Sequence, residues 1–404
     1  MPSFHEARRI ILENVAPLGA EVVPALDAVG RVVAEDVKAP FDLPRWDNSA
    51  MDGFALRAQD AAAPGGLRVS GYVPAGATPS GDLAPGTAVR VLTGAPLPPG
   101  TDTVVPIEET EERDGVVRLL RPVRAGAHVR RRGEDIRAGE AALTAGTVLG
   151  PAELSALASS SRLAVPVVRR ARVAILSTGD ELVEPGAPLA PGLIHDSNAW
   201  ALAAAVRQAG AIPTALGIAR DDREALRRLL GEGLAADALV TSAGVSVGDR
   251  DLVREVLEEL GVRQLFWKID IKPGRPTAFG LAGRTPVFSL PGNPVATLLT
   301  FEQFVRPALL RMMGHARVLR PLVPATLHGG LARRPGRVEF VRVRLERRGD
   351  GLVATSAGDQ ATGMLKTLLR ADGLVVVPAE RGPIEPGGAV EVQVLRGELE
   401  PWEA

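Results

Sequence analysis

Short apolar runs alternate with helical periodicity between residue 171 and about residue 317, as in successive strand–helix units. Four runs rich in Val, Ile and Leu are predicted as strands, at residues 173–176, 212–218, 238–240 and 287–290. Four stretches with apolar residues on one helical face are predicted as helices, at residues 198–208, 224–230, 251–260 and about 295–313. This alternation predicts a doubly wound α/β domain with a mostly parallel sheet and helices on both faces.

The residues on either side of this block show the alternating positions of β-strands, interrupted by Gly and Pro. Before the block, apolar runs such as 88–92 lie between turn residues; after it, residues 338–345 alternate up to a turn at 349–351. No repeat of about 20–50 residues is visible, which argues against solenoids and propellers. The sequence therefore predicts a multidomain α/β and β protein, with small β-rich domains flanking the central one and a C-terminal β-barrel-like domain.

The composition narrows the possible functions. The 404 residues suffice for about two to four domains, and 47 basic against 48 acidic residues leave no basic footprint for a nucleic acid or a membrane. The absence of Cys excludes disulfides, zinc–thiolate sites, iron–sulfur clusters and a Cys nucleophile. Residues 1–13 lack the apolar segment of a signal peptide, and no run reaches the roughly 18 apolar residues of a membrane span. We therefore expect a cytoplasmic protein.

Four polar, Gly-bearing loops follow apolar runs of the central block, at residues 177–182, 241–249, 272–276 and 291–294. Parallel strands end at the same edge of a sheet, and open α/β folds bind ligands at that carboxyl edge. Glycines let backbone amides approach an anion, and helices that start after Gly248 and Pro294 add positive dipole ends. Any one loop has an ordinary reading as a simple turn, but four at one edge predict a single anion-binding site.

The charged residues near these loops suggest phosphate and a hard cation. Lys268 and Lys272 are two of only four lysines in a chain otherwise rich in arginine, and a compact ammonium suits phosphate. The alternative is an ordinary solvated lysine. Carboxylates at the same edge would be repulsive unless Mg²⁺ or substrate hydroxyl groups bridged them, and helix capping is the competing interpretation. These carboxylates are Asp180, Glu181, Asp221, Asp222, Asp249 and Asp251.

A transition-metal site and a nucleophilic triad are both disfavoured. The five histidines are scattered without ligand spacing, so a metal held by side chains should have oxygen ligands. No Gly-x-Ser-x-Gly signature is present. Two further polar segments lie outside the central block, at residues 47–55 and 130–136, and each alone reads equally well as a solvated loop.

Seven motifs in order resemble those of the molybdopterin molybdenumtransferase family, the molybdenum insertases that include the E domain of gephyrin. They are Asn-Ser-Ala-Met-Asp-Gly at 48–53, Leu-Thr-Gly-Ala at 92–95, Gly-Glu-Asp-Ile at 133–136, Thr-Gly-Asp-Glu-Leu at 178–182, Gly-Val-Ser-Val-Gly at 244–248, Lys-Pro-Gly at 272–274 and Pro-Gly-Asn-Pro at 291–294. The resemblance covers residues 4 to 378. The Met-Asp-Gly motif separates the chain from single-domain molybdopterin adenylyltransferases, which share only the central fold.

The resemblance implies a reaction in which adenylylated molybdopterin and molybdate give molybdenum cofactor and AMP, with Mg²⁺ as cofactor. It implies a homodimer whose site lies between the central domain of one subunit and the Met-Asp-Gly domain of the other, and a molybdopterin adenylyltransferase as a candidate partner. The expected domains are 1–20 with 171–317 (central, molybdopterin-binding), 21–40 with 140–170 (linking and dimerisation), 41–139 (β-rich) and 318–404 (C-terminal). An adenylyltransferase that activates molybdopterin and a non-enzymatic scaffold are the alternatives.

The motif positions also imply site residues. Catalytic roles are expected for Asp52, Asp135, Glu181, Asp221 and Asp251, with Asp52 and Glu181 as Mg²⁺ ligands or proton donors. Substrate contacts are expected from Thr93, Thr178, Gly179, Ser242, Gly244, Ser246, Gly248, Lys268, Lys272, Arg275, Pro291, Gly292, Asn293, Pro294 and Thr362. The chain departs from the family at Arg275, where a second lysine is usual, at Ala243, where a glycine is usual, and in the segment of Gln360, Thr362 and Thr367, which usually carries serines.

Overall fold

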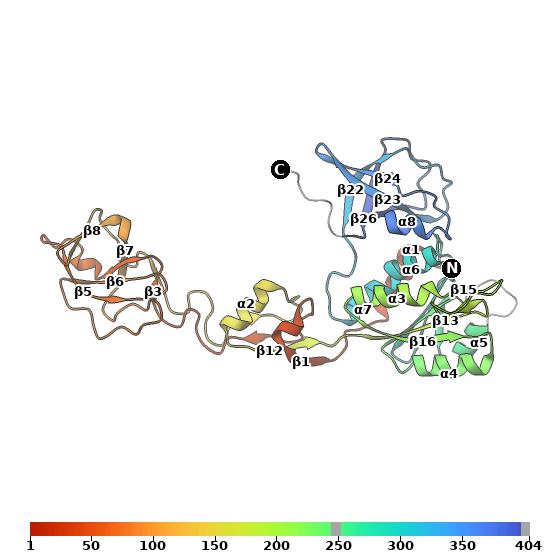
Figure 1. Ribbon diagram of the computed structural model, residues 1–404, viewed down its shortest axis with the longest axis horizontal. Coiled ribbons are helices and arrows are strands. Elements are labelled where there is room, and N and C mark those ends of the chain that lie inside the picture. Colours follow the sequence, from red (N-terminus) through yellow and green to blue (C-terminus); the bar gives the residue numbers. More distant parts are fainter. Residues whose placement is uncertain (244–251, 397–404) are drawn as a thin grey trace. The chain divides into compact units, whose positions relative to one another are not determined.

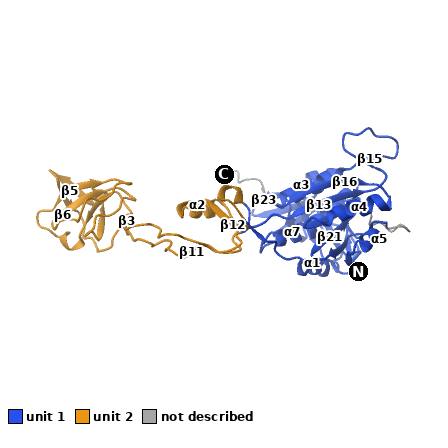
Figure 2. Ribbon diagram, turned by 90° about the horizontal axis from the view of Figure 1, so that it is seen from below, with its two compact units in different colours: residues 1–21, 30–32, 168–404 blue, residues 22–29, 33–167 orange. Residues whose placement is uncertain are grey.

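The computed structural model describes residues 1–243 and 252–396 and divides the chain into two compact units. Unit 1 comprises Met1–Glu21, Gly30–Val32 and Val168–Ala404, and unit 2 comprises Val22–Val29 and Val33–Val167 (Figure 2). The finer division into four domains stays a prediction. No helix among the described residues is both long and apolar enough to cross a membrane.

A six-stranded sheet forms the centre of unit 1, in the order β16-β13-β17-β21-β20-β18. Its strands are β13 (Arg172–Thr178), β16 (Ile212–Ala219), β17 (Ala238–Ser242), β18 (Arg263–Phe266), β20 (Ala278–Ala282) and β21 (Thr285–Leu290). The first three pairings in this order are parallel and the last two are antiparallel. The expected mostly parallel sheet is therefore confirmed, whereas β18 and β20 had not been predicted.

Helices cover both faces of this sheet, which confirms the doubly wound arrangement (Figure 1). Successive side chains of a strand point to opposite faces. Val173 and Ile175 accordingly lie in one buried cluster, while Ala174 and Leu176 lie in another. The first cluster includes residues of α1 (Phe4–Glu13), α3 (Ser197–Gln208), α6 (Pro294–Thr300) and α7 (Arg306–Met312); the second includes residues of α4 (Arg223–Gly233) and α5 (Leu252–Glu259).

The helix expected at about 295–313 is interrupted by a π-helical turn, η4 (Phe301–Val305), between α6 and α7. Pro307, just after this turn, has no backbone N–H to give to the carbonyl of the preceding turn, which explains why regular α-helical bonding is lost here. The same region contacts the N-terminal helix, where the Phe4 ring packs edge-on against Phe304 and Phe340. The Ser3 hydroxyl caps that helix by accepting from the Glu6 amide at 3.3 Å.

The C-terminal part of unit 1 is a β-barrel, as expected. Its sheet has the order β19-β23-β24-β22-β26-β25, and an additional pairing of β23 with β25 closes it. The strands are β19 (Ile271–Lys272), β22 (Leu322–His328), β23 (Val338–Arg348), β24 (Gly351–Ser356), β25 (Gly373–Val377) and β26 (Ala389–Val394), with one helix, α8 (Leu365–Arg370). Gly349 has a φ of +56° in the tight turn between β23 and β24, a conformation that favours glycine.

Unit 2 contains a further six-stranded sheet, in the order β7-β4-β6-β5-β9-β8, with buried clusters on both faces. Its strands are β4 (Gly53–Leu56), β5 (Leu67–Val73), β6 (Thr87–Val91), β7 (Thr103–Pro106), β8 (Thr110–Arg113) and β9 (Val116–Leu119). A separate small core lies among α2 (Pro151–Ser159), η1 (Ala25–Ala28), β1 (Ala20–Pro24), β12 (Ala164–Val168), β2 (Val37–Lys38) and β11 (Ala141–Leu143). Short elements complete the chain: η2 (Ala58–Asp60), η3 (Ile107–Glu109), β3 (Asn48–Ser49) with β10 (Val129–Arg130), and β14 (Leu182–Val183) with β15 (Ile194–His195).

Gly53, the glycine of the Met-Asp-Gly motif, is required by the close packing of this sheet. A Cβ at this position would lie 1.9 Å from the carbonyl oxygen of Val105 on the neighbouring strand. We expect Gly53→Ala to lower the free energy of unfolding by about 3 kcal/mol, because backbone must move to relieve the clash. Gly71→Ala is the matched control, since a Cβ there has nothing within 4 Å. Equal losses in urea unfolding for the two variants would contradict this explanation.

Candidate functional site

Three of the four predicted loops meet at the carboxyl edge of the central sheet. The strands that precede them are in register there: Ser177 of β13 lies opposite Ser242 of β17, which lies opposite Leu290 of β21. The loops that begin at Thr178, Ala243 and Pro291 therefore leave the sheet side by side. This is the arrangement that the sequence predicted.

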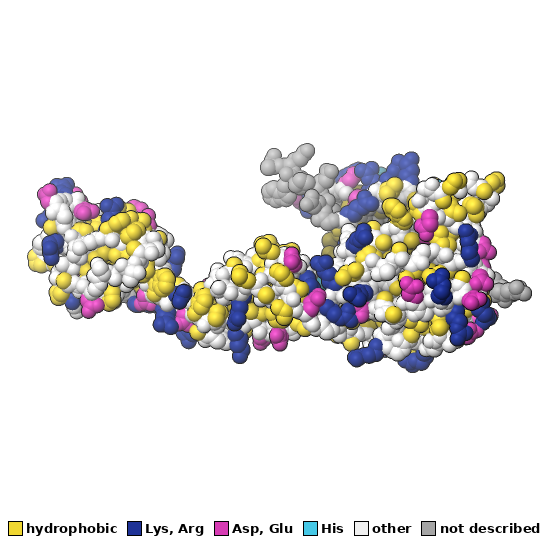
Figure 3. Space-filling view, turned by 60° about the horizontal axis from the view of Figure 1, so that its bottom comes forward, with side chains coloured by type: hydrophobic (Ala, Val, Ile, Leu, Met, Phe, Trp, Pro, Cys, Tyr) yellow, Lys and Arg dark blue, Asp and Glu magenta, His cyan; other side chains and the backbone are white. Residues whose placement is uncertain are grey.

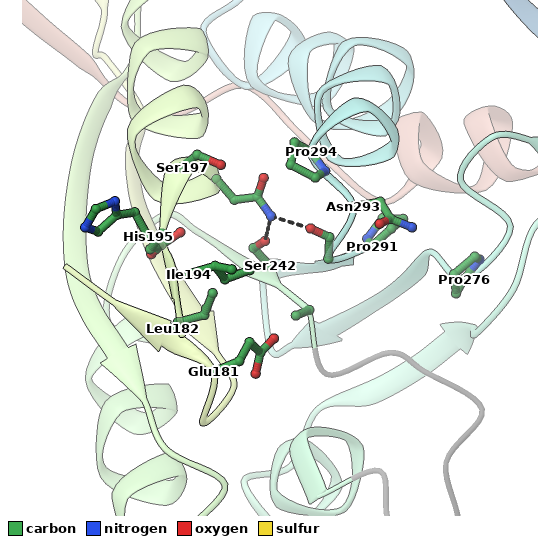
Figure 4. Close-up of a pocket in the computed structure, with 14 residues that line it drawn as sticks. Glu181, Leu182, Ile194, His195, Ser197, Ser242, Pro276, Pro291, Asn293 and Pro294 are labelled. Carbon is green, nitrogen blue, oxygen red and sulfur yellow. Dashed lines mark hydrogen bonds between the residues drawn. The ribbon is translucent and has the colours of Figure 1, made fainter. Parts of the chain in front are cut away.

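A cavity of about 420 Å³ lies among these loops (Figure 4). Six expected site residues line it: Glu181, Ser242, Pro291, Gly292, Asn293 and Pro294. The remaining lining residues are Leu182, Ile194, His195, Asp196, Ser197, Asn198, Ala243 and Pro276. The cavity thus combines two carboxylates, those of Glu181 and Asp196, with several small polar groups and the starts of two helices, α3 and α6, whose positive dipole ends favour an anion.

Asn198, on the first turn of α3, joins two of the loops and had not been predicted as a site residue. Its side-chain amide donates to Ser242 Oγ at 2.8 Å and to the carbonyl oxygen of Gly292 at 2.7 Å (dashed lines in Figure 4). Its Oδ1 atom is buried and accepts no hydrogen bond from a described residue. The neighbouring Asp196 caps the helix by accepting from the amide of Ala199, so Asn198 is free to hold the loops.

The segment after β13 brings Glu181 to the cavity. Thr178 is buried, and its hydroxyl donates to the Ser242 carbonyl at 3.4 Å. Gly179 has a φ of +140°, and a Cβ here would lie 2.4 Å from Glu181 Oε2, so the carboxylate lies directly over the glycine. The glycine therefore makes room for the Glu181 side chain as well as for the turn.

Glu181 belongs to a group of three carboxylates with Asp180 and Asp221. The Asp221 amide donates to Asp180 Oδ1 at 3.2 Å. Burial raises the pKa of the Asp221 carboxyl above its ordinary value, and the negative charges of Asp180 and Glu181 raise it further. Within residues 1–243 and 252–396, no group of three or more His, Asp or Glu side chains is arranged to hold a metal ion by itself. Asp222 only caps α4, by accepting from the Ala225 amide.

The raised pKa of Asp221 has a consequence for stability. Below the pKa of the unfolded chain both states are protonated and the group contributes nothing, whereas above the folded pKa its ionisation destabilises the fold. We expect Asp221→Asn to raise the melting temperature by about 1–2 °C at pH 7 and to leave it unchanged at pH 3. Calorimetry at both pH values measures this difference. A lower melting temperature at pH 7 would show that the charged form is stabilised instead.

The Lys-Pro-Gly loop is built differently from the other three. Its lysine lies on β19, which pairs with β23 of the C-terminal barrel, and Lys272 Nζ is 2.8 Å from Glu339 Oε1. Gly274 has a φ of +104°, and a Cβ there would lie 2.4 Å from Thr300 Cγ2. Pro276 is the member of the loop that lines the cavity; Lys268, Lys272 and Arg275 do not line it, and Lys268 and Arg275 make no ion pair with a described residue.

Two motifs of unit 2 meet at Asp52 and Thr93. Asp52 Oδ1 accepts from the Thr93 amide and from the Thr93 hydroxyl, both at 2.7 Å. These hydrogen bonds hold the pKa of the exposed Asp52 carboxyl below its ordinary value. Asp52 and Thr93 are 41 positions apart in the sequence, so only the folded chain brings them into contact.

The basic and acidic loop at 130–136 is held by structural contacts. Arg131 and Arg132 pair with Asp47 and Asp42, at 2.7 and 2.6 Å, and the Glu134 carboxylate accepts from the Arg131 amide at 2.6 Å. Asp135 is exposed, and its side chain makes no hydrogen bond with a described residue. The contacts of the neighbouring residues therefore hold the loop in place and leave the Asp135 carboxylate exposed to solvent.

In the C-terminal barrel, two of the three expected polar residues have structural contacts. The Gln360 side chain accepts from the backbone amide of Arg342 at 2.9 Å and donates to the backbone carbonyl of Arg342 at 3.1 Å. The buried Thr367 hydroxyl donates to the Met364 carbonyl. Thr362 is half-buried. The Arg342 side chain, which had not been predicted, is buried beneath this segment, and burial lowers the pKa of its guanidinium. Its Nε and Nη1 atoms have no hydrogen-bond partner among the described residues.

Some expected site residues lie outside the described residues: Gly244, Ser246, Gly248, Asp249 and Asp251. Ala243, at the edge of this gap, has a φ of +70°, where glycine is favoured. The described edge offers oxygen acceptors, amide donors and helix starts around a cavity with both polar and apolar walls. This chemistry suits a phosphate-bearing ligand that also carries hydroxyl or amine groups.

Three family models match consecutive parts of the chain. The MoeA N-terminal region (domain I and II) matches residues 2–161, the probable molybdopterin binding domain matches residues 174–311, and the MoeA C-terminal region (domain IV) matches residues 324–395. Together they span most of the chain.

Full-length relatives match as well. The molybdopterin molybdenumtransferase 2 of Mycobacterium tuberculosis is 37% identical over 97% of this chain and 99% of its own length. The molybdopterin molybdenumtransferase of Nostoc is 38% identical over 98% of this chain and 94% of its own. Among solved structures, the molybdopterin biosynthesis MoeA protein of Pyrococcus horikoshii OT3 matches with a TM-score of 0.83 and 29% identity, over 98% of this chain and 100% of that one.

Proposed function

The chain belongs to the molybdopterin molybdenumtransferase family, and from this premise we propose that it inserts molybdenum from molybdate into adenylylated molybdopterin, releasing AMP. Membership makes it a transferase of molybdenum cofactor biosynthesis. The observation that supports the finer reaction is the cavity at the carboxyl edge, where Glu181, Ser242 and the 291–294 loop surround space for a phosphate-bearing ligand.

Each group of residues has a proposed role. Lys268, Lys272 and Arg275 neutralise the phosphates of the pterin and of AMP. Ser242, held by Asn198, and the Pro-Gly-Asn-Pro loop orient the ligand. Asp52, which its lowered pKa keeps ionised, binds Mg²⁺, and Glu181 binds Mg²⁺ or donates protons to departing oxo groups, which would leave molybdenum bound by the dithiolene of the pterin. The protein needs no thiolate for this, in keeping with its lack of Cys.

The proposed Mg²⁺ requires ligands from more than one source. Because the described residues contain no complete metal-binding group, we infer that Glu181 and Asp52 each supply one oxygen and that substrate phosphates supply others. Mg²⁺ usually keeps several water ligands and binds through one or two carboxylates plus phosphate, so an incomplete protein site is what such an ion needs.

A homodimer belongs to the same proposal, with the site shared between the Met-Asp-Gly motif of one subunit and the central sheet of the other. Its support is a set of exposed apolar residues in unit 2, whose surface shows hydrophobic as well as charged side chains (Figure 3). They are Val22, Leu26, Val29, Val148 and Leu163. The Ala25 amide donates to the Leu163 carbonyl at 2.9 Å, so Leu26 and Leu163 lie on neighbouring segments. Exposed apolar patches commonly mark interfaces.

We expect the double variant Leu26→Asp/Leu163→Asp to run as a single chain, because the carboxylates would be buried without partners in the dimer. These two side chains are 83% and 80% exposed in the isolated chain. Leu120→Asp is the matched control, since Leu120 is also exposed in unit 2 but lies just after β9, away from Leu26 and Leu163 in the sequence. Light scattering after gel filtration measures the mass. An unchanged mass of the double variant would place the interface elsewhere.

The experiment that tests the reaction is AMP release from adenylylated molybdopterin by the purified protein with Mg²⁺, with and without molybdate. Molybdate-stimulated release supports the insertase. Tight binding without release would make the chain a carrier or scaffold, and ATP consumption without molybdate would make it an adenylyltransferase. A cytoplasmic location and delivery of the substrate by a molybdopterin adenylyltransferase complete the proposal.

A further inference from the structure

Glu339, the second residue of β23 in the C-terminal barrel, faces the lysine of the Lys-Pro-Gly loop. The parallel register of β19 and β23 sets Lys272 opposite Glu339, and their charged atoms are 2.8 Å apart. The Glu339 side chain is only 13% exposed, whereas that of Lys272 is 62% exposed. The carboxylate is therefore fixed within the barrel, and the ammonium is held at the surface by it.

Arg333 fixes Glu339 from behind. Its Nε atom is 3.4 Å from Glu339 Oε2, and its side chain is 2% exposed. The same guanidinium donates to the carbonyl oxygens of Arg337, Pro378 and Arg381 at 2.7, 2.7 and 2.5 Å. Arg333 is thus anchored to the barrel backbone, and its Nε atom forms an ion pair with Glu339 without a hydrogen bond. The trio of Arg333, Glu339 and Lys272 carries one net positive charge, so Lys272 is not neutralised as a phosphate ligand.

A lysine held in this way is better prepared for an anion than a free one. The ammonium has three N–H donors, and Glu339 occupies one of them, which leaves two for phosphate oxygens. Ordering a long, flexible lysine side chain costs conformational entropy, and a partner that orders it before binding removes that cost from the binding step.

We propose that Glu339 is a positioning residue, which holds the ammonium of Lys272 for the substrate phosphate. This inference rests on the proposed function, because it takes Lys272 as a phosphate ligand. The competing explanation is an ion pair that only fastens β19 to β23. The two explanations differ in whether losing Glu339 raises KM through Lys272 or only lowers the stability of the fold.

A double-mutant cycle separates them. We expect Glu339→Gln to raise the KM for adenylylated molybdopterin about tenfold while kcat for molybdate-dependent AMP release stays within about twofold. Lys272→Ala should raise KM by more, and adding Glu339→Gln to Lys272→Ala should change KM no further. Glu339→Asp, which keeps the charge, should recover part of the loss. Additive effects of the two substitutions would overturn the proposal.

Two controls complete the experiment. Glu346→Gln removes an exposed carboxylate of the same strand, which pairs only with Arg348 at 2.9 Å among the described residues, and it should leave KM unchanged. Thermal unfolding of all variants checks the fold. A Glu339→Gln protein with a lower melting temperature and an unchanged KM would show that the ion pair only stabilises the pairing of β19 with β23, and it would contradict the inference. If the wild-type protein releases no AMP, the proposed function fails; if wild type and Lys272→Ala behave as expected but Glu339→Gln has a normal KM, the positioning role alone fails.

Discussion

Replacing Asp52 with alanine is expected to lower molybdate-dependent AMP release by at least about a hundredfold without unfolding the protein. The carboxylate is oriented by two hydrogen bonds from Thr93 to Oδ1, at 2.7 Å each, and its pKa is held below the ordinary value. It is therefore ionised at neutral pH, and Oδ2 accepts no hydrogen bond from a described residue. An oriented anion with a free oxygen suits a metal ion or a proton, and losing such a group typically costs about 10²–10⁴ in rate.

Three comparisons make the Asp52 prediction specific. Asp52→Asn keeps an acceptor for the Thr93 bonds but loses the charge, so it should be nearly as inactive as Asp52→Ala if charge is what matters. Asp82→Ala removes an exposed carboxylate of the same unit and should keep full activity. Because the pKa of Asp52 is lowered, the rate between pH 6 and 8 should not follow its titration. A fully active Asp52→Ala protein would refute the role assigned to this residue.

Local patterns predicted most of the central domain correctly. The strands and helices of the βα block are visible in the periodicity of their own residues. Asp196 and Asp222 indicate where α3 and α4 start, because an N-cap side chain accepts from backbone amides only a few residues further along the chain. The strand at Ala278–Ala282 was missed because it is a short run of small and apolar residues with a central glycine, which has weak strand propensity. The π-helical turn was also missed, because a change from i→i+4 to i→i+5 hydrogen bonds is not visible in the apolar pattern of the sequence.

The site was less predictable where it depends on contacts between distant residues. Lys272 was expected beside the other loops, but its strand joins the barrel through Val338 and Glu339, more than 60 positions away. Nothing in the local pattern of residues 271–276 indicates such a pairing. Asn198 was taken as part of a helix start, because its two hydrogen bonds reach loops that are 44 and 94 positions distant. Gln360 and Thr367 lie in the segment of the expected substrate contact Thr362, and both make hydrogen bonds to backbone groups near them.

The proposed sharing of the site between subunits makes a quantitative prediction for mixed dimers. Asp52→Ala and Lys272→Ala proteins should each be nearly inactive. In a heterodimer of the two, one site combines both defects and the other combines intact Asp52 of one subunit with intact Lys272 of its partner. Random mixing makes about half of the dimers heterodimers, so the mixture should recover about a quarter of the wild-type rate.

The recovery should depend on exchange of subunits and on nothing else. It requires the two proteins to be unfolded and refolded together, or expressed together, and simple mixing of stable dimers is the control that should stay inactive. The Leu26→Asp/Leu163→Asp background should abolish recovery, because it removes the dimer in which the sites are completed. Activity near zero after verified heterodimer formation would mean that Asp52 and Lys272 act within one chain, whereas recovery without heterodimers would mean that neither residue is needed. A rate near one quarter, lost in the monomeric background, is the result that a shared site alone produces.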